Sequence, residues 1–515
     1  MSSENLKSVA QPTTVHASTT ETGITVDIDA ARAASVVDIS TQDQAAHNRQ
    51  KYTQQFNRMG YYHAFFGGKE RIMRMVPTAM ATTSLADAVP LQPEFMERGA
   101  FQNQYRHLPT VPSGINPENQ KPSYQKPADI WLTNKNRNLY TGLCFNPEEA
   151  PLAINKFGQF NLYQGRAVIP ADCPRRDSVV FLKPFLDHIM INLCHRDEPT
   201  FWSFINVMAA KYQNPTIKPF ATIIHGIEGT GKDTVIEPFM RLYGAHGKKA
   251  TKASQVIGEY NSGTLSNCTF LWMDEAFAGT KDATDCMKTV VFSDRLRLTD
   301  KYIPAWEERS LNQTVLSTNR EGMIRFATHD RRYFVLKMAE DRAKDTPENK
   351  AYFDEIWNLI NSTAFLGHLA NYLLKVDVSQ FNFRRPPVTK NMALQKLSTA
   401  DPDEQFIHQV IIDGGFRLLV RDGLPEGESP VLSWPEKIHA TDLTQAFDMW
   451  LRDNRVPFAK NKDIALGATL IKYGFSKKPA MRLNGKNKRG WMLPTIKEAK
   501  ERMIKILGAD ISDEI

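Results

Sequence analysis

The chain has 515 residues, of which 42% are hydrophobic and 23% are charged, a balance typical of globular proteins with several domains. It contains no run of about 18 apolar residues and no signal-peptide pattern at its start, which argues against a membrane span and favours a cytoplasmic location. Its five cysteines stand far apart without a CxxC pair, so the sequence predicts neither a disulfide framework nor a zinc finger.

The formal net charge of +7 is concentrated in one segment near the C-terminal end. Residues 455–492 contain ten Lys or Arg and one acid, Asp463, so this segment alone carries +9. A basic surface of this size attracts phosphate backbones and therefore predicts contact with nucleic acid. A solvated basic surface that binds nothing is the alternative interpretation.

The N-terminal third of the chain shows weak structural signals. Residues 1–50 contain no aromatic residue and are rich in Ser, Thr, Ala and Gln, which predicts a disordered tail. Residues 51–178 are interpreted as a small α+β domain. Within it, the sequence from Tyr61 predicts a hairpin that turns at Gly67–Gly68, whereas residues 88–170 read as irregular.

Residues 179–345 carry the pattern of an α/β core. Apolar residues at helical spacing predict helices at 181–193 and 198–213, and a further helix over 234–244 that Gly244 ends. Four short apolar runs predict buried strands: FATIIH, CTFLWMDE, NQTVLSTN and RYFVLKM. Strands that alternate with helices predict a parallel sheet covered on both faces.

The C-terminal part is predicted to be helical and then basic. Residues 346–400 are interpreted as a helical connector, residues 401–500 as a winged-helix-like DNA-binding domain, and residues 501–515 as a tail. The second of these predictions rests on amphipathic helices followed by a basic hairpin that turns near Asn484–Gly485.

One of these helices, KDIALGATLIKYGF, carries four apolar residues, which we expect to face the core of the domain: Ile464, Leu466, Leu470 and Ile471.

Residues 226–232 read GIEGTGK and lie between a predicted strand and a predicted helix. Glycines at this place let backbone N–H groups turn toward phosphates, and the helix N-terminus adds positive potential. Lys232 would reach the β- and γ-phosphates of ATP. A glycine-rich turn with an incidental Lys is the alternative. The predicted nucleotide-binding residues are Gly226, Gly229, Thr230, Gly231, Lys232, Asp233 and Thr234.

The position after Lys232 departs from the usual pattern. It normally holds Ser or Thr, whose hydroxyl binds Mg²⁺, but here it is Asp233. Thr234 is rotated by about 100° on the helix and cannot simply take over that role. Because Mg²⁺ accepts carboxylates, Asp233 is predicted to bind the metal directly or through water.

Polar residues follow two of the predicted strands. Asp274 and Glu275 end one strand, where Asp274 would hold Mg²⁺ and Glu275 would orient the attacking water. Asn319 ends another, where its amide could sense the γ-phosphate. Arg331 or Arg332, just before the last strand, could reach the nucleotide of a neighbouring subunit as a finger. A solvated acidic turn, a turn-forming Asn and a surface Asp–Arg pair are the respective alternatives.

Together these elements resemble superfamily 3 helicases, specifically the helicase module of phage-type and poxvirus-type primase–helicases, over roughly residues 130–495. Phosphate loop, acidic pair, Asn and Arg pair follow in this order within about 105 residues, which is specific. The stretches that carry the resemblance are WLTNKNRNLYTGLCFNP, FNLYQG, GIEGTGKDT, LWMDEAF, LTDKYIPAWEERSLNQTVLSTN and HDRRYF.

The resemblance implies a P-loop motor of the AAA+ kind with an irregular N-terminal region and a C-terminal winged helix. It implies a ring of identical subunits, six in this superfamily, that hydrolyses ATP with Mg²⁺ to move along one DNA strand and unwind a duplex during phage or mobile-element replication. It assigns Lys232 to phosphate, Asp274 and Glu275 to the acidic pair, Asn319 to the sensor, and Arg331 or Arg332 to the finger.

Further DNA contacts follow from the resemblance and the charge pattern. Lys301, between two strands in LTDKYIP, matches the hairpin lysine that projects into the ring and grips DNA phosphate; a solvated loop lysine is the alternative. The basic segment adds duplex contacts at Lys477, Lys478, Lys486, Lys488 and Arg489. A primase or polymerase is expected on another chain or absent, because the upstream region lacks paired carboxylates for two metals.

A binding protein remains the second hypothesis, an origin-binding or loading AAA+ protein that uses ATP only to assemble on DNA. Glu275 and the Arg pair favour turnover over such a static switch. A remodeller of other substrates is disfavoured by the basic C-terminal segment.

Overall fold

The structure is a computed structural model that describes residues 41–66, 69–77, 90–118, 121–275, 281–301, 303–319, 332–418, 431–483 and 486–509. The chain divides into two compact units. The first comprises residues 1–55 and 104–136, and the second comprises residues 56–103 and 137–515.

Helix α1 (Thr41–Arg58) dominates the first unit, together with the hairpin of β4 (Val111–Ile115) and β5 (Pro122–Gln125) and the short helix α3 (Pro127–Thr133). Arg49 on α1 donates a hydrogen bond of 2.7 Å to the Ser113 carbonyl. The expectation of disorder up to residue 50 was therefore wrong for residues 41–50, because polar contacts with a hairpin hold this helix where aromatic residues are lacking. Residues 1–40 lie outside the described part.

The second unit begins with a small sheet in the order β3-β2-β1-β6. The predicted hairpin is confirmed, since β1 (Tyr61–Phe66) and β2 (Lys69–Pro77) pair in antiparallel fashion; its glycine turn lies outside the described residues. The region expected to be irregular holds further short elements, which a sequence pattern detects poorly because each is short. In the second unit these are β3 (Leu91–Met96), α2 (Arg98–Gln104), β6 (Leu139–Tyr140), β7 (Gly142–Cys144) and β8 (Gln159–Asn161).

A five-stranded, all-parallel sheet forms the centre of the second unit and confirms the predicted α/β class. Its strand order is β10 (Gly247–Ala250), β11 (Phe270–Asp274), β14 (Gln313–Thr318), β9 (Ala221–His225) and β15 (Tyr333–Lys337). Four of these strands were predicted. The edge strand β10 was missed because its sequence, GKKA, has no apolar run.

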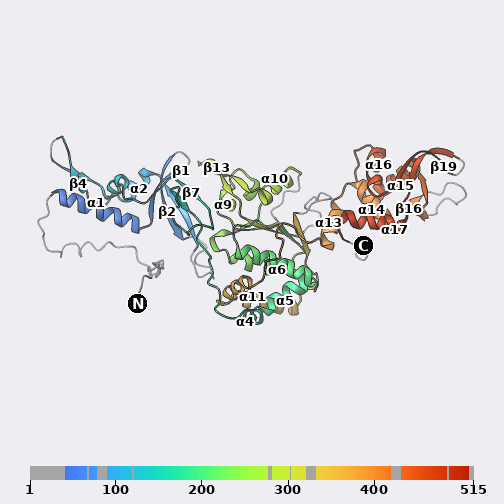
Figure 1. Ribbon diagram of the computed structural model, residues 1–515, viewed down its shortest axis with the longest axis horizontal. Helices are drawn as coiled ribbons and strands as arrows, with labels where there is room; N and C mark the ends of the chain where they lie inside the picture. Colours follow the sequence, from blue (N-terminus) through green and yellow to red (C-terminus); the bar gives the residue numbers. More distant parts are fainter. Residues whose placement is uncertain are drawn as a thin grey trace, which may run out of the picture. The chain divides into compact units, whose positions relative to one another are not determined.

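Alternate residues of the strands face two separate cores, as the period of two requires. Ile224 of β9 belongs to one core and Ile223 to the other. Figure 1 shows α6 on one side of the sheet and α10 on the other. The helices of the first face are α4 (Arg175–Phe181), α5 (Lys183–His188), a π-helix (Ile189–Leu193), α6 (Glu198–Gln213), α7 (Lys232–Arg241), α11 (Pro347–Ile360) and α12 (Phe365–Leu374); those of the second are α8 (Ser254–Ile257), α9 (Ser262–Leu265) and α10 (Lys281–Phe292).

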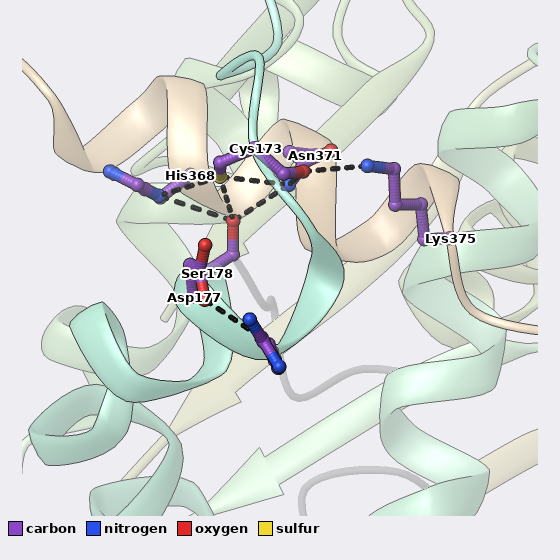
Figure 2. Close-up of polar contacts among 7 residues, drawn as sticks. Cys173, Asp177, Ser178, His368, Asn371 and Lys375 are labelled. Atoms are coloured by element: carbon purple, nitrogen blue, oxygen red, sulfur yellow. Dashed lines mark hydrogen bonds and ion pairs between the residues drawn. The ribbon is translucent and has the colours of Figure 1, made fainter.

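A buried polar cluster ties α4 to α12 (Figure 2). The Ser178 hydroxyl lies 3.1 Å from His368 Nδ1 and accepts a hydrogen bond of 2.8 Å from the Asn371 amide. Lys375 Nζ donates to the Cys173 carbonyl at 2.7 Å. Although a Ser–His pair can be a nucleophilic centre, Ser178 is 0% exposed, so no substrate reaches its hydroxyl. The cluster therefore has a structural role, because its hydrogen bonds connect the two helices.

The C-terminal part has the predicted order of helices followed by a hairpin. The three-stranded sheet β18-β20-β19 packs with the helices of this part around one apolar core, as in a winged helix. The elements are α13 (Lys390–Thr399), α14 (Pro402–Asp413), β16 (Phe416–Leu418), β17 (Val431–Ser433), β18 (Lys437–His439), α15 (Ala440–Asp453), α16 (Lys462–Lys472), β19 (Ser476–Leu483), β20 (Lys486–Met492) and α17 (Ile496–Leu507).

The predicted core face of α16 was half wrong. Leu466 and Leu470 are buried, but Ile464 is 72% exposed and Ile471 is 61% exposed. The helical repeat explains the result, because residues four apart share one face, whereas Ile464 and Ile471, seven apart, share another.

None of the helices that the structure describes is both long and apolar enough to cross a lipid bilayer.

Candidate nucleotide-binding site and nucleic-acid contacts

The predicted phosphate loop connects β9 to α7 and depends on its glycines. Gly229 and Gly231 have φ angles of +80° and +89°, a region that other residues rarely adopt. A Cβ on Gly226 would lie 2.8 Å from Met338 Cβ, and one on Gly231 would lie 2.7 Å from Phe353. The loop is therefore packed closely from outside and cannot take side chains at these positions.

Lys232 is the first residue of α7 and turns its ammonium back over the loop. It is 8% exposed and donates to the Gly226 carbonyl at 2.7 Å and to the Ile227 carbonyl at 3.0 Å. Burial lowers its pKa, while the carboxylates of four acids raise it: Asp233, Glu275, Asp274 and Glu228. The loop thus holds a cation where a phosphate-binding lysine is needed.

Two other predicted loop residues are fixed by the fold. Thr230 is 0% exposed, and its hydroxyl donates to the Ile227 carbonyl at 2.8 Å. Thr234 is 2% exposed within α7.

The acidic pair stands at the carboxyl end of β11, beside β14. The Ser317 hydroxyl donates to Asp274 Oδ1 at 2.7 Å and itself accepts a hydrogen bond of 2.8 Å from the Trp272 indole. Glu275 has a φ of +50°, an uncommon conformation for this residue type, and its N–H donates to the Ser317 carbonyl at 3.0 Å. Backbone strain of this kind gathers at functional sites, and the side chain it carries is exposed.

A residue that the sequence did not single out, Lys249 on β10, joins this group. Its ammonium lies 2.9 Å from Asp274 and 4.0 Å from Asp233, and 3.5 Å from the centre of the Trp272 ring. A signal for it could have been found in the parallel pairing of β10 with β11, which places Lys249 opposite Trp272. Without a predicted β10, that pairing was out of reach.

The carboxylates of Asp233 and Asp274 fit a divalent cation, because both already lie beside one positive charge, the Lys249 ammonium. Loss of surrounding water raises the pKa of Asp233, and the Lys249 ammonium opposes that rise. Mg²⁺ is commonly held by one or two carboxylates together with substrate phosphates, which matches Asp233 and Asp274 beside the phosphate loop. Among the described residues no group of three or more His, Cys, Asp and Glu could hold a metal on its own.

The carboxyl ends of three neighbouring strands bring these residues together. The Gly226 N–H donates to the Thr318 carbonyl at 3.1 Å, so the start of the loop touches the end of β14. Asn319 follows directly and is exposed. Phosphate loop, acidic pair and Asn319 therefore share one edge of the sheet, as the sequence predicted.

Arg332 lies at the opposite ends of the strands, the amino ends. Its carbonyl accepts a hydrogen bond of 3.1 Å from the Ala221 N–H at the start of β9, and its guanidinium lies 5.1 Å from the centre of the Phe292 ring. Strands of five residues separate the two edges by roughly 16 Å. Arg332 is thus remote from the phosphate loop of its own chain. Arg331 lies outside the described residues.

Lys301 occupies the turn between β12 (Arg295–Asp300) and β13 (Ile303–Arg309), an antiparallel hairpin as the sequence predicted. Its side chain is exposed, and its N–H donates to the Asp300 carboxylate at 2.6 Å. The other oxygen of Asp300 accepts 2.6 Å from the Ser262 hydroxyl of α9. The turn is thereby anchored to the core while the lysine remains accessible.

The basic hairpin of β19 and β20 exposes Lys477, Lys478, Lys488 and Arg489; the side chain of Lys486 lies outside the described residues. The charge of residues 455–492 is partly neutralised by ion pairs with Asp401, Asp448 and Glu404, which lie outside the segment, while Asp463 is the acid that the net charge of +9 already includes. The ion pairs are Lys460–Asp401, Lys462–Asp448, Lys472–Glu404 and Arg489–Asp463. The net charge of the segment therefore overstates the basic surface.

Comparisons with known proteins agree with this fold. Residues 224–332 match the model of a family described as "Family of unknown function (DUF5906)", a stretch that runs from the end of β9 to Arg332. No curated protein matches the chain.

Solved structures of the C-terminal region of NrS-1, an apo structure and two described as A form apo structures, are similar to this chain. Their TM-scores are 0.56, 0.56 and 0.55, at 15%, 15% and 14% sequence identity. The alignments cover 87%, 86% and 87% of this chain and 99% of each NrS-1 chain. At this identity the likeness shows a shared fold.

Proposed function

We propose that this protein is an ATP-dependent DNA helicase that works as a ring of identical subunits in the replication of a phage or mobile element. One observation carries the proposal. A glycine-rich loop with a buried lysine, an acidic pair and an exposed Asn meet at the carboxyl edge of an all-parallel sheet. This is the arrangement that ATP hydrolysis by P-loop motors needs.

The residues at this edge divide the chemistry among them. Lys232 leaves its two loop carbonyls to bind the β- and γ-phosphates, which replace those oxygens as acceptors. Glu275 accepts a proton of the attacking water and aligns it with the γ-phosphorus, and Asn319 contacts the γ-phosphate. Asp274 and Asp233 would hold Mg²⁺, which would supply charge that stabilises the phosphates in the transition state.

Coupling to DNA is assigned to residues away from this edge. Arg331 or Arg332 is proposed to complete the site of the next subunit, since Arg332 stands roughly 16 Å from its own loop. Lys301 is proposed to hold the strand inside the ring, and the basic hairpin of β19 and β20 to hold duplex DNA. The proposal keeps the division made from the sequence, with residues 179–345 as motor and 401–500 as DNA-binding domain. A separate primase or polymerase is the proposed partner in replication.

A loading protein that binds ATP without sustained turnover is the second candidate, and Lys249 is the observation that favours it. An ammonium 2.9 Å from Asp274 already neutralises the carboxylate proposed to hold the metal. If Lys249 stays in place when ATP binds, hydrolysis is slow and ATP acts as an assembly signal.

DNA-stimulated ATP hydrolysis separates the two candidates. The helicase should turn over ATP many times with single-stranded DNA, and both Lys232→Ala and Glu275→Gln should lower the rate by about a hundredfold or more, since each removes a group acting on the transition state. Glu275→Gln should still bind a fluorescent ATP analogue, which shows that its site is folded. A single turnover per subunit in the wild-type protein would favour the loader.

A further inference from the structure

A cavity lined by several cations lies at the amino ends of the strands of the central sheet, here called the amino-edge cavity. Its volume is about 790 Å³, within the range of ligand-binding sites. Its walls come from the segments that precede β9, β14 and β15, from the junction of α10 with β12, and from residues 383–384 after α12. It is therefore separated from the phosphate loop by the length of the strands.

Positive charge dominates this amino-edge cavity. Five of its lining residues are cations and one, Asp294, is an acid; the cations are Lys218, Arg295, Arg309, Arg332 and Arg384. The Arg295 guanidinium lies 3.8 Å from the Glu307 carboxylate. Cations gathered in one hollow repel each other, so such a set is retained where an anion is to be bound.

Lys218 supplies a charge from the floor of the cavity. Its ammonium donates to the Ser293 carbonyl at 2.5 Å and to the Ser310 hydroxyl at 2.6 Å. Burial lowers its pKa to about 8, and the Asp294 carboxylate opposes that shift. An anion in the cavity would stabilise the protonated form in the same way.

Two of the arginines are oriented by aromatic rings of the cavity. Arg332 lies 5.1 Å from the centre of the Phe292 ring, and Arg384 lies 5.8 Å from that of Phe383. Both rings are half-buried lining residues. Guanidinium groups that lie over aromatic rings are a combination with which proteins bind the phosphates and bases of single strands.

We propose that the amino-edge cavity is a second phosphate-binding site, which takes a nucleotide phosphate from outside its own ATP site. The source is either the backbone of the DNA strand or the nucleotide of a neighbouring copy. A nucleotide at the chain's own phosphate loop is excluded as the source, because roughly 16 Å of strand separate the amino ends from the carboxyl ends. The phosphate chemistry stands on the cavity alone, and the identity of the source rests on the proposed function.

Tripolyphosphate is the probe, and Lys232→Ala is the background, so that the phosphate loop does not contribute. Adding Arg309→Ala and Arg384→Ala should weaken tripolyphosphate binding in calorimetry by about tenfold or more, because two charge-assisted contacts are lost. The matched control adds Arg176→Ala and Arg385→Ala, which remove the same charge from exposed positions outside the cavity, and should leave the affinity unchanged. A second variant with Arg309→Lys and Arg384→Lys keeps the charge and should retain most of the binding.

Two further arms identify the source. The first arm measures oligo-dT binding by the Arg309→Ala/Arg384→Ala variant with Lys232 intact. If the variant binds oligo-dT more weakly and with a shallower salt dependence than the wild type, the source is the DNA strand. If the variant binds oligo-dT as the wild type does, loses ATP hydrolysis, and regains it when mixed with Lys232→Ala protein, the source is the neighbour's nucleotide. Equal tripolyphosphate affinity in the background and the cavity variant overturns the inference. Absence of wild-type ATP hydrolysis would instead contradict the proposed function and leave the tripolyphosphate result standing.

Discussion

At the scale of single residues, Lys249 lies beside the two carboxylates that we propose to bind Mg²⁺. Asp274 is already engaged by the Ser317 hydroxyl and by Lys249, and Asp233 lies 4.0 Å from the same ammonium. A divalent cation that binds there has to displace Lys249 or share the carboxylates with it. Under the proposed function, the lysine would therefore compete with Mg²⁺ for these carboxylates.

Magnesium titration of ATP hydrolysis measures this competition. Lys249→Met keeps the apolar stem over Trp272 but removes the charge, so half-maximal activity should need less Mg²⁺. Asp233→Ala should shift the titration the other way, and Asp233→Ser should keep at least part of the activity, since a hydroxyl is the commoner ligand at this position. Titrations that coincide for wild type, Lys249→Met and Asp233→Ala would mean that neither side chain faces the metal.

At the scale of elements, the hairpin of β12 and β13 and the hairpin of β19 and β20 are proposed to hold DNA in different ways. The first presents one lysine, Lys301, on a turn anchored to α9 through Asp300. The second presents several exposed cations on a sheet. A single lysine per subunit suits a moving grip, whereas a basic surface suits a static electrostatic hold.

Substitutions in the two hairpins should separate these roles. Lys486→Ala, Lys488→Ala and Arg489→Ala together should weaken DNA binding across sequences and reduce its salt dependence, while ATP hydrolysis without DNA survives. Arg489 is already paired with Asp463, so Lys477→Ala and Lys478→Ala should add to the effect. Lys301→Ala should leave initial DNA binding mostly intact and uncouple hydrolysis from unwinding. Normal unwinding by Lys301→Ala would contradict this division.

The elements also mark what a sequence can disclose. Buried strands such as FATIIH and the loop GIEGTGK can be predicted from the sequence, because continuous apolar runs and glycines at set positions are local signals. The edge strand β10 has no such pattern, so Lys249 was missed together with its strand. Ion pairs such as Lys472–Glu404 join residues distant in sequence, so no count within one segment could foresee them. The exposed Ile464 was misplaced because an apolar residue on a short helix does not reveal which face is covered.

At the scale of the whole molecule, the proposed role of Arg332 would make ATP hydrolysis depend on assembly. An arginine at the amino ends of the strands acts on the γ-phosphate of ATP only if another subunit brings the carboxyl ends of its own strands alongside. A head-to-tail contact of that kind forms a ring when its rotation closes, and the proposed homo-oligomer of six requires such a contact.

Subunit mixing tests this dependence. The Arg331→Ala/Arg332→Ala variant and the Lys232→Ala variant should each be inactive alone, but mixtures should regain part of the ATP hydrolysis because some interfaces pair an intact loop with an intact arginine. Native mass spectrometry shows whether mixed rings form. Mixed rings without any activity would refute a finger that acts between subunits.

Stability of the whole chain should fall as the pH drops. Burial lowers the pKa of His188, His246 and His408 to about 4 each, below the ordinary 6.5. The unfolded chain therefore binds more protons between these two values, and each histidine should cost roughly 2 kcal/mol at about pH 5. Glu308, whose pKa burial raises, contributes in the opposite direction.

Thermal melting at about pH 7 and pH 5 checks this expectation. The melting temperature should be lower at pH 5, and His408→Gln should reduce the difference by removing one of the three groups. An equal melting temperature at both values would mean that these histidines are not held neutral by burial.

The central claim, that ATP hydrolysis at this site drives strand separation, is tested most directly by displacement of a labelled strand from a forked DNA duplex. With ATP and Mg²⁺ the wild-type protein should release the strand, and Glu275→Gln protein at the same concentration should bind the fork without releasing it. Release that is equal in the wild-type and Glu275→Gln proteins, or no release by wild-type protein that hydrolyses ATP on DNA, would contradict the account.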